Sequence, residues 1–415
     1  MTVKGMSLMK VFNGLIFKSL AFITILLSSE VVLAQEINSG EKTTAELVKL
    51  GYENVRWVEN DQERIYTIEN TAYRLNGVGI AKAIKTIQEM GLPLGKDCKV
   101  IVTKLNVPQI ALTYNAPKCA EDKASTRDWD VSFDLDGSWE KVKKAKKKNN
   151  SLFKVDILVY PQLSYKNMII TQIYQALFDL SPAIEVSLWP GMKLTGQVKI
   201  PVYNDGYGFL EDKVHPGFIT LSQRFRLPKK IFGKLTVGYF NLDRYGVDLA
   251  LNKPFKDERF AVEGRIGFTG IGYWDGFHLH YDKDMTMTWS VGGSFYWPKY
   301  NTQFILRAHQ FLLKEKGVKF EMIRHFRYAS VGFYAEKGEH ARSNGGFRIQ
   351  VALPPYKQRR HKYIPRISTS SNMGIAYNAG NERRYYKEYR SEASDNIMEN
   401  NGFNPYFIKS ELLIY

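Results

Sequence analysis

The sequence predicts a mainly β protein, in which an antiparallel outer-membrane β-barrel of roughly 12 to 16 strands follows a small α/β domain. Three observations predict this class. Segments of alternating apolar and polar residues recur over the C-terminal two thirds of the chain. Many of these segments reach about ten residues, which is enough to cross a bilayer when the strand is tilted. The N-terminal residues are typical of a secretory signal peptide.

The alternation is clearest in residues 191–201, and the same pattern returns in many later segments. Successive side chains of a strand point to opposite faces, so this segment has one apolar and one cationic face. The apolar face holds Met192, Leu194, Val198 and Ile200, and the polar face holds Lys193, Thr195, Gln197 and Lys199. The alternating segments recur with no second helical layer to cover an apolar face, which favours a closed barrel in lipid over a soluble sandwich.

Export from the cytoplasm is predicted by residues 1–34. Lys10 and Lys18 precede an apolar run at 20–27, and the small residues of 32–34 lie before Gln35. After this segment no run of about 18 apolar residues occurs, so we expect no membrane helix. We therefore expect the protein in the outer membrane of a Gram-negative bacterium, with an N-terminal periplasmic segment.

Residues 41–125 are predicted to form the small periplasmic α/β domain. Apolar residues at helical spacing predict helices, and alternating stretches predict strands. Gly77 and Gly79 indicate the entry to a helix, because neither a third glycine nor a Lys-Ser/Thr pair follows to make a phosphate loop. We expect helices at 43–50 and 80–90, and strands at 54–59, 64–74, 99–105 and 110–114.

A Lys-rich linker is predicted at 126–151, and the barrel is predicted at 152–415. Six lysines crowd 141–148, as a solvated segment or as one attracted to anionic lipid or glycan. The final residues, 407–415, end in an aromatic side chain and are expected to form the strand that closes the barrel.

The chain has two cysteines, Cys98 and Cys119. We expect them to form one disulfide in the oxidising periplasm, and two unpaired thiols are the alternative. No accompanying histidine or second cysteine pair indicates a metal site, and we expect neither a metal nor another cofactor.

The formal net charge of +16 favours an anionic partner. Export removes nucleic acid from the natural partners and leaves an acidic polysaccharide, outer-membrane lipid and lipopolysaccharide. Two polar, Tyr-rich stretches, 355–366 and 378–402, are expected to be extracellular loops or a gating segment that contacts lipopolysaccharide phosphate.

Several fragments between about 180 and 355 resemble, in order, the YjbH family of exopolysaccharide-associated outer-membrane proteins. The fragments are 187–191, 194–196, 201–204, 235–240, 244–247, 253–255, 316–318, 324–326, 331–333, 345–349 and 353–354. The resemblance implies an outer-membrane β-barrel that acts in exopolysaccharide or capsule secretion, with periplasmic polysaccharide-export proteins as partners. It carries over no catalytic residues. Typical members are longer and hold more β structure ahead of this region.

The polar face of the predicted strands suggests a cationic lumen that suits an acidic glycan. The candidate lumen residues are Lys193, Lys199, Arg224, Arg226, Lys234, Arg265 and Arg348. The alternative is that these charges form local ion pairs and only fill the interior.

We expect no enzyme activity, although a lipid- or glycan-modifying barrel enzyme is one alternative. Its best candidates, His278 and His280 near Asp282, have no partnered nucleophile and are expected in a surface loop. A second alternative is a non-conducting assembly or binding component, in which the α/β domain docks another part of the export machinery.

Overall fold

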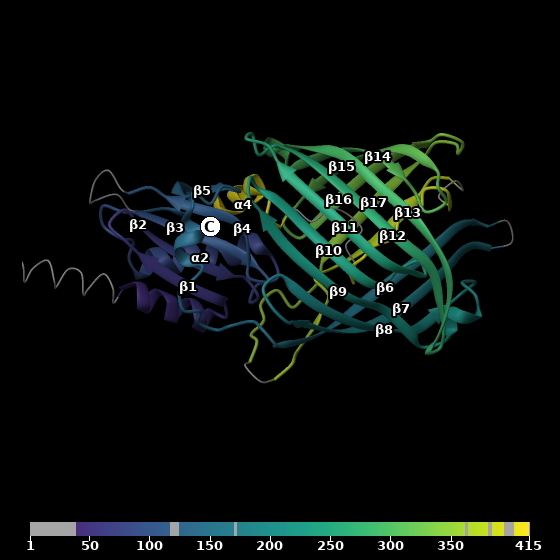
Figure 1. The fold of residues 1–415 in the computed structure, drawn as a ribbon, viewed down its shortest axis with the longest axis horizontal. Coiled ribbons are helices and arrows are strands. Elements are labelled where there is room, and N and C mark those ends of the chain that lie inside the picture. The colour runs from purple at the N-terminus through teal and green to yellow at the C-terminus, as the bar shows by residue number, and fades with distance from the viewer. Residues whose placement is uncertain are drawn as a thin grey trace, which may run out of the picture.

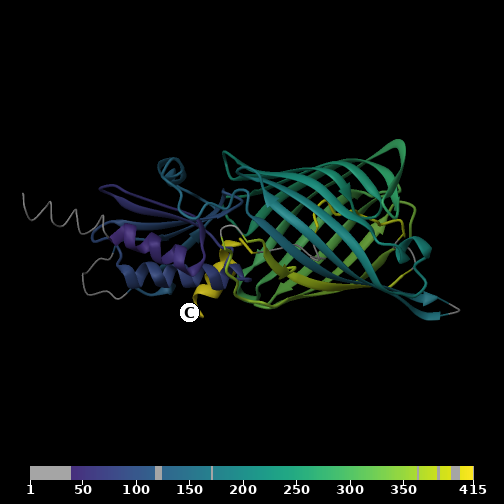
Figure 2. The same ribbon diagram turned by 90° about the horizontal axis from the view of Figure 1, so that it is seen from below.

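The computed structural model describes residues 39–116, 124–169, 172–361, 364–380, 384–393 and 402–414. The predicted signal peptide, residues 1–34, lies outside them. A small sheet with its helices lies at one end of the molecule, and a large sheet of long strands forms the rest (Figures 1 and 2). The protein is thus mainly β, as the alternating pattern predicts.

The small sheet has five strands in the order β1-β2-β3-β4-β5. The strands are β1 (Glu53–Glu59), β2 (Glu63–Glu69), β3 (Asp97–Lys104), β4 (Val107–Tyr114) and β5 (Asp130–Ser132). β2 and β3 are parallel, and helix α2 (Asn76–Met90) connects them. A further helical segment covers 39–50. The predicted helices and the first four strands are therefore confirmed, with bounds that differ by a few residues.

The C-terminal residues form a helix, α4 (Pro405–Leu412), so the predicted closing strand at 407–415 is wrong. The side chain of Asn404 caps this helix by accepting hydrogen bonds from the backbone N–H groups of Tyr406 and Phe407 at 3.0 and 3.2 Å. Ile408 and Leu412 are four residues apart, share one helix face, and are fully buried in the core of the small domain. Among the described residues, no helix is long and apolar enough to cross a membrane.

Helix α4 packs closely against α2 on the same face of the small sheet as the 39–50 segment (Figure 2). Gly77 of α2 permits this approach, because a Cβ atom there would lie 2.6 Å from Cβ of Glu411. Helix α4 thus completes the core of the small domain, although the large sheet lies between α4 and the rest of this domain in the sequence.

The predicted linker at 126–151 is folded against the small domain. It contains the 3₁₀ helix η1 (Thr126–Asp128), strand β5 paired with β4, and the short helix α3 (Ser138–Val142). Val142 is buried against the second face of the sheet with Ile65 and Ile101. Two lysines of the cationic run form ion pairs at 2.5 Å, Lys141 with Glu63 and Lys148 with Glu41. Short strands such as β5 have too few residues to show a periodic pattern.

The large sheet has 14 strands, within the predicted range of strand number. Its order is β18-β6-β7-β8-β9-β10-β11-β12-β13-β14-β15-β16-β17-β19, and every pair is antiparallel except β18 with β6. The strands are β6 (Val155–Ile169), β7 (Gln172–Ser187), β8 (Met192–Asn204), β9 (His215–Leu227), β10 (Ile231–Phe240), β11 (Arg244–Pro254), β12 (Phe260–Asp275), β13 (His278–Trp297), β14 (Thr302–Gln310), β15 (Lys316–His325), β16 (Ala329–Gly338), β17 (Asn344–Ala352), β18 (Arg366–Thr369) and β19 (Asn372–Asn378).

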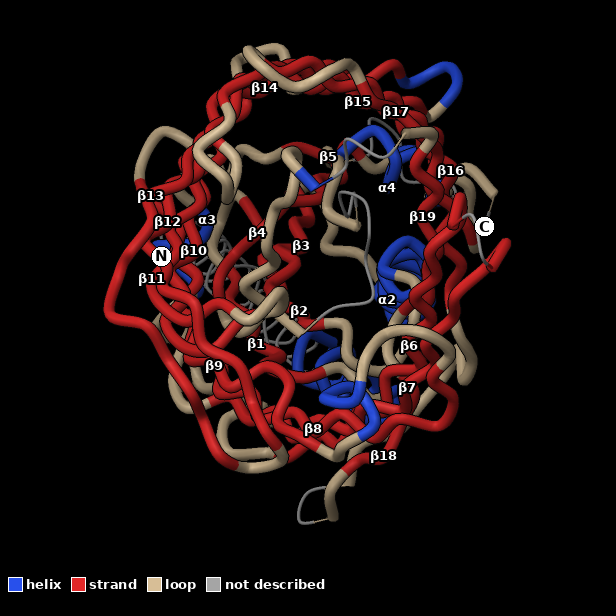
Figure 3. Tube along the Cα trace, turned by 90° about the vertical axis from the view of Figure 1, so that its right-hand side faces the viewer, coloured by secondary structure: helices blue, strands red, loops and turns tan. Residues whose placement is uncertain are grey.

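The two ends of this strand order, β18 and β19, are consecutive in the chain and are separated only by Ser370 and Ser371. The backbone N–H of Ser370 donates to the carbonyl of Val159 in β6 at 2.9 Å, and that of Leu353 donates to Ser371 at 3.1 Å. Seen from the end opposite the small sheet, the strands follow one another around a ring (Figure 3). The segment from β18 to β19 therefore contacts strands at both edges of the sheet.

We expect Leu412→Ala to destabilise the small domain by about 2–5 kcal/mol, because a fully buried leucine is replaced by a cavity. The matched control is Leu413→Ala, since the neighbouring side chain is 46% exposed. Native-state hydrogen exchange of β3 and β4 measures the difference. Equal protection in the two variants would contradict the role of α4 in the core.

Candidate functional site in the interior of the large sheet

The large sheet buries polar side chains and exposes apolar ones. In β10 and β11, Thr236 and Asp248 are 0% and 1% exposed, whereas Val237 is 46% exposed. A water-soluble sheet has the opposite arrangement, with apolar residues packed on a core. The interior of the ring is consequently a polar compartment, and its chemistry comes from the inward-facing polar residues.

The strand register makes the outer apolar surface continuous. Residues that are directly opposite each other on neighbouring strands share one face of the sheet. One row crosses six strands through the exposed side chains of Leu194, Leu221, Val237, Val247, Phe268 and Met287. The neighbouring inward positions carry Thr195 beside Thr220 and Thr236 beside Asp248. The apolar and polar faces are therefore properties of the whole sheet.

A segment of the chain, residues 384–393, lies in this polar interior; we call it the inner segment. The ring of Tyr389 stacks on that of Phe240 at 5.4 Å between centroids. Its hydroxyl donates a hydrogen bond to Oδ2 of Asp248 at 2.8 Å, and the backbone N–H of Leu312 donates to the carbonyl of Lys387 at 3.2 Å. The described part of the predicted loop 378–402 thus includes a segment that contacts the inner wall.

The first carboxylate of the inner segment, Glu388, lies between β14 and β15. Its two oxygens accept from Nδ1 of His309 at 2.7 Å and from Nζ of Lys319 at 2.6 Å. We call His309 and Lys319 the distal cluster. Both cluster side chains are nearly inaccessible to solvent, so the carboxylate supplies the charge that a buried ammonium group needs.

The second carboxylate, Glu392, lies between β9 and β10. Both of its oxygens lie 2.9 Å from Nη2 of Arg224, and Oε2 lies 3.1 Å from Nζ of Lys234. We call Arg224 and Lys234 the proximal cluster, because it is the nearer of the two to Lys104 of the small domain.

All seven predicted lumen residues have partners in the structure, so the alternative of local ion pairing describes the geometry of six of them. Their binding of a glycan stays a prediction. The pairs are Lys193 with Glu185 (3.0 Å), Lys199 with Glu211 (3.0 Å), Arg224 and Lys234 with Glu392, Arg265 with Asp248 (2.7 Å), and Arg348 with Glu321 (2.7 Å). The seventh, Arg226, donates to the carbonyl of Gln109 at 2.9 Å and so contacts the small domain.

The alternating pattern places Glu185, the partner of Lys193, on the polar face, but sequence reasoning missed the other acidic partners and the distal cluster. Lys319 and Glu321 share an alternating segment with Val318 and Phe320, and this pattern could have placed them on the inner face. No local signal pairs Glu388 with Lys319, 69 residues away, or Glu392 with Arg224, 168 residues away.

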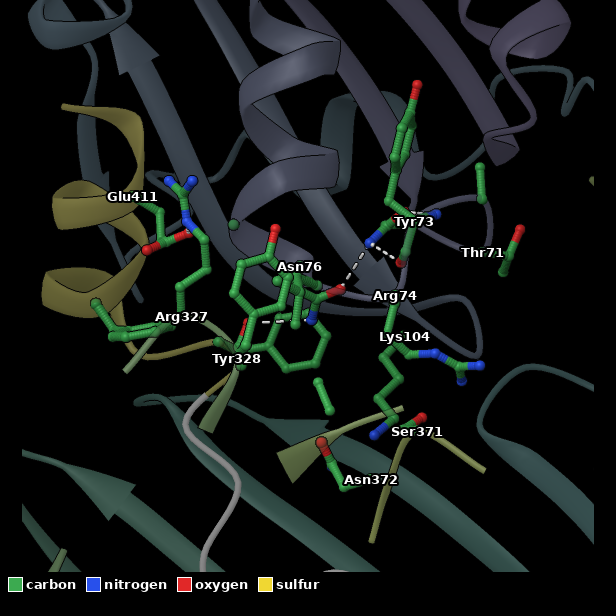
Figure 4. A pocket seen from close by; sticks show the side chains of 18 of the residues that line it. Thr71, Tyr73, Arg74, Asn76, Lys104, Arg327, Tyr328, Ser371, Asn372 and Glu411 are labelled. Carbon is green, nitrogen blue, oxygen red and sulfur yellow. Dashed lines mark hydrogen bonds and ion pairs between the residues drawn. The ribbon is translucent and has the colours of Figure 1, made fainter. Parts of the chain in front are cut away.

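A pocket of roughly 310 Å³ lies where the small domain meets the large sheet (Figure 4). Arg74 and Lys104 line it from the small domain, and Arg327, Ser371 and Asn372 line it from the large sheet. In Figure 4, Lys104 extends from the end of β3 towards Ser371. The pocket therefore brings cationic side chains from both domains to one end of the polar interior.

The positive charge of Arg224, together with burial, lowers the pKa of Lys104 to about 7. Glu392 acts in the opposite direction and holds the pKa of this amine above the value that the cations alone would set. The pKa of Lys104 therefore depends on whether a carboxylate is bound to the proximal cluster. It connects the small domain with the inner segment by electrostatics.

Arg360 joins the two domains, although its stretch, 355–366, is predicted to be an outer loop. Its guanidinium group pairs with Glu53 of β1 at 2.8 Å and also with Asp156 of β6. Arg366 pairs with the same Asp156 at 3.0 Å and donates to the carbonyl of Thr71 at 2.6 Å. The side chains of Arg360 and Arg366 are therefore largely shielded at the junction, whereas most described residues of the stretch are exposed.

The turns of the large sheet at this end also contact the small domain. The contacts include Gly191 N–H to the Leu105 carbonyl (2.6 Å), Glu258 to Ser132 (2.8 Å), Asn301 to Ser410 (3.2 Å) and Arg327 to Glu411 (2.8 Å). The small domain thus covers one end of the ring, and the hairpins at the other end are not covered by it (Figure 1).

The other predicted candidates have plainer surroundings. His278 and His280 belong to strand β13 rather than to a loop, with ring centroids 4.6 Å apart, at the hairpin away from the small domain. In the described part of the chain, no three His, Cys, Asp or Glu side chains gather as a metal site.

Cys98 is buried in the small domain, where burial raises the pKa of its thiol. Cys119 lies outside the described residues, so the predicted disulfide stays a prediction.

In comparisons with known proteins, the chain matches no family model, no curated protein and no solved structure. The resemblance to the YjbH family therefore stays a prediction. The interior geometry is the main evidence about function.

We expect the Lys104 amine to titrate near pH 7 in the folded protein, with a higher midpoint in Arg224→Gln because the repelling charge is gone. The lowered pKa means that the unfolded chain binds more protons between about pH 7 and 10.5, so this group makes the free energy of unfolding rise with pH in that window. NMR of ¹³C-methylated lysines, assigned with Lys104→Met, measures the midpoint. Arg259→Gln at an exposed turn is the control, and an unchanged midpoint in Arg224→Gln would contradict the assignment.

Proposed function

We propose that this chain is an outer-membrane β-barrel that takes part in the secretion or assembly of an exopolysaccharide or capsule. In this proposal, the large sheet closes on itself through the chain that runs from β18 to β19 and crosses the outer membrane of a Gram-negative bacterium. The observation that carries the proposal is the reversed polarity of the sheet, with apolar side chains outside and polar side chains inside.

Physical chemistry supports this conclusion. Lipid accepts a sheet only when its strand edges are paired, because an exposed backbone polar group has no water to bind there. Soluble monomers rarely expose apolar patches larger than a few hundred Å². A band of exposed Leu, Val, Phe and Met across six neighbouring strands is instead the surface that a bilayer covers.

The turns and the small domain support one orientation of the sheet in the membrane. Membrane barrels of this class have short periplasmic turns and longer outer loops. The turns that contact the small domain, such as 228–230 and 326–328, are short. The connections at the other end vary in length, from the two residues 276–277 to the ten residues 205–214. These features support a periplasmic small domain that docks partners of the export machinery.

The proposed cargo is an acidic polysaccharide, because the inner wall carries arginine and lysine side chains, and two of them, Arg224 and Lys234, pair with the inner segment rather than with acids of the wall. Planar guanidinium groups suit carboxylate and phosphate. The fragments that resemble the YjbH family point to the same cargo class. We expect no catalytic step and no cofactor.

A second candidate is a non-conducting assembly or binding component of the same machinery. The inner segment favours it, because this segment occupies space that a conducting pore would need. Conductance of the purified protein in planar bilayers separates the two candidates: ion-conducting steps support a pore, and silence supports the assembly role.

We expect Leu306→Arg to destabilise the folded protein in lipid vesicles by about 2–4 kcal/mol, because a lipid-facing charge must be desolvated. In a soluble sheet the same change would be nearly neutral, since Leu306 is 58% exposed. The control is Leu94→Arg in the small domain, where the side chain is 73% exposed. Heat-modifiable gel migration after refolding measures the folded fraction, and equal fractions for both variants would argue against a membrane-spanning sheet.

For the cargo, we expect charge reversal at Arg224, Arg226 and Arg348 together to reduce surface acidic polysaccharide several-fold, since the wall then repels the polymer. The matched control reverses three exposed turn residues, Lys229, Lys256 and Arg259. Uronic acid assays of the cell surface give the measurement. Normal export by a correctly inserted triple variant would exclude the cationic wall as the cargo path.

A further inference from the structure

The inner segment is bound to the wall through its two carboxylates and through hydrogen bonds of Tyr386, Tyr389 and Ser391. Glu388 and Glu392 are four residues apart, and each accepts from two basic side chains of neighbouring strands. The remaining described residues of the segment are aromatic, basic or small. The two carboxylates therefore present spaced negative charges to basic side chains of the wall.

The proximal cluster depends on the inner segment for its charge balance. In the described part of the chain, Glu392 is the only carboxylate that pairs with Arg224 or Lys234. Other wall cations have acids of the wall itself, as Arg265 has Asp248 and Arg348 has Glu321. Removing the segment would leave two partly buried cations without a carboxylate, which is costly unless another anion replaces it.

The inner segment is not a strand of the sheet. Its described backbone contacts to the wall include single hydrogen bonds, such as Leu312 N–H to the Lys387 carbonyl and Arg390 N–H to Oδ1 of Asn241 at 2.5 Å. No described residue of 384–393 is in a strand of the 14-stranded sheet. Its release would break these contacts and leave every strand pair of the sheet intact.

An aromatic surface lies between the two clusters. Tyr389 covers the ring of Phe240 in a parallel stack, with an angle of 4° between the ring planes. When Tyr389 leaves, this ring face becomes accessible, and the apolar face of a sugar ring can take its place. The wall thus offers a cation pair, an aromatic face and a second cationic cluster in succession.

We propose that the proximal and distal clusters are two carboxylate-binding subsites for a uronic-acid polymer, and that the inner segment is a built-in competitor that occupies both until the polymer displaces it. The acidic glycan as ligand rests on the proposed function. Binding by the purified protein and export by cells are separate measurements, so the two proposals can fail separately.

The first test measures binding of a short oligogalacturonate to the full chain in detergent by calorimetry. We expect Glu388→Gln with Glu392→Gln to bind about tenfold more tightly than the wild type, because the competitor loses its charges. The control is Glu339→Gln at an exposed position. Adding Arg224→Gln and Lys234→Gln to the double variant should abolish the gain, and neutral maltooligosaccharide should not bind.

Unchanged affinity in a double variant that still migrates as the folded form would overturn the proposal. Tighter binding without any effect of the chain on export would retain the subsites and refute the proposed function instead.

The second test keeps both carboxylates, so it does not depend on a variant that might misfold. Ser391→Cys is introduced into a chain with Cys98→Ala and Cys119→Ala, and its labelling by a maleimide is timed. Ser391 is buried and donates to Oδ1 of Asp248 at 2.9 Å, so labelling is slow while the segment is bound. Saturating oligogalacturonate should accelerate labelling several-fold. An unchanged rate at saturation would show that the ligand binds without displacing the segment, and would overturn the proposal that the segment is a competitor.

Discussion

A charge that is removed from water needs a counter-charge, and this requirement organises the interior of the large sheet. The alternation that puts Leu, Val and Phe outside puts Arg and Lys inside, so the ring needs internal acids. Some come from the wall, as Asp248 pairs with Arg265 and Glu321 with Arg348. The rest come from the inner segment, whose two carboxylates are the partners of the proximal and distal clusters. The position of this segment is therefore a consequence of the charges on the wall.

The same requirement joins the two domains. Asp156 at the start of the large sheet accepts from both Arg360 and Arg366, and Arg360 also reaches Glu53 of the small sheet. Removing Asp156 would leave Arg366 without a carboxylate partner among the described residues of the junction. Helix α4 follows the large sheet in sequence but belongs to the core of the small domain. The chain therefore crosses the junction between the two domains twice. The small domain and the interior are consequently coupled in charge and in chain connectivity.

Local periodicity predicts many strands of the large sheet, since alternation over about ten residues indicates which side chains face outward, but it does not predict a strand as short as β18. It also placed α2, whose apolar residues recur at helical spacing. It failed for 407–415, where Phe407, Ile408 and Leu412 were assigned to a strand although the Asn404-Pro405 start and the i, i+4 spacing of Ile408 and Leu412 favour a helix. The inner segment could not be predicted, because its ion pairs join residues that are far apart in sequence. Such pairs follow from the three-dimensional arrangement of the strands and leave no local pattern.

The two subsites differ in their distance from the small domain, and this difference sets an order of events. Lys104 lies near the proximal cluster, and its pKa depends on Arg224 and Glu392. A polymer that enters from the small domain therefore meets Lys104 first, then the Arg224–Lys234 pair, then the ring of Phe240. Displacing Glu392 frees only one end of the inner segment, because Glu388 remains bound to His309 and Lys319. The segment would then be released stepwise from the proximal to the distal cluster, so that each cation exchanges one carboxylate for another and none is left unpaired in the interior.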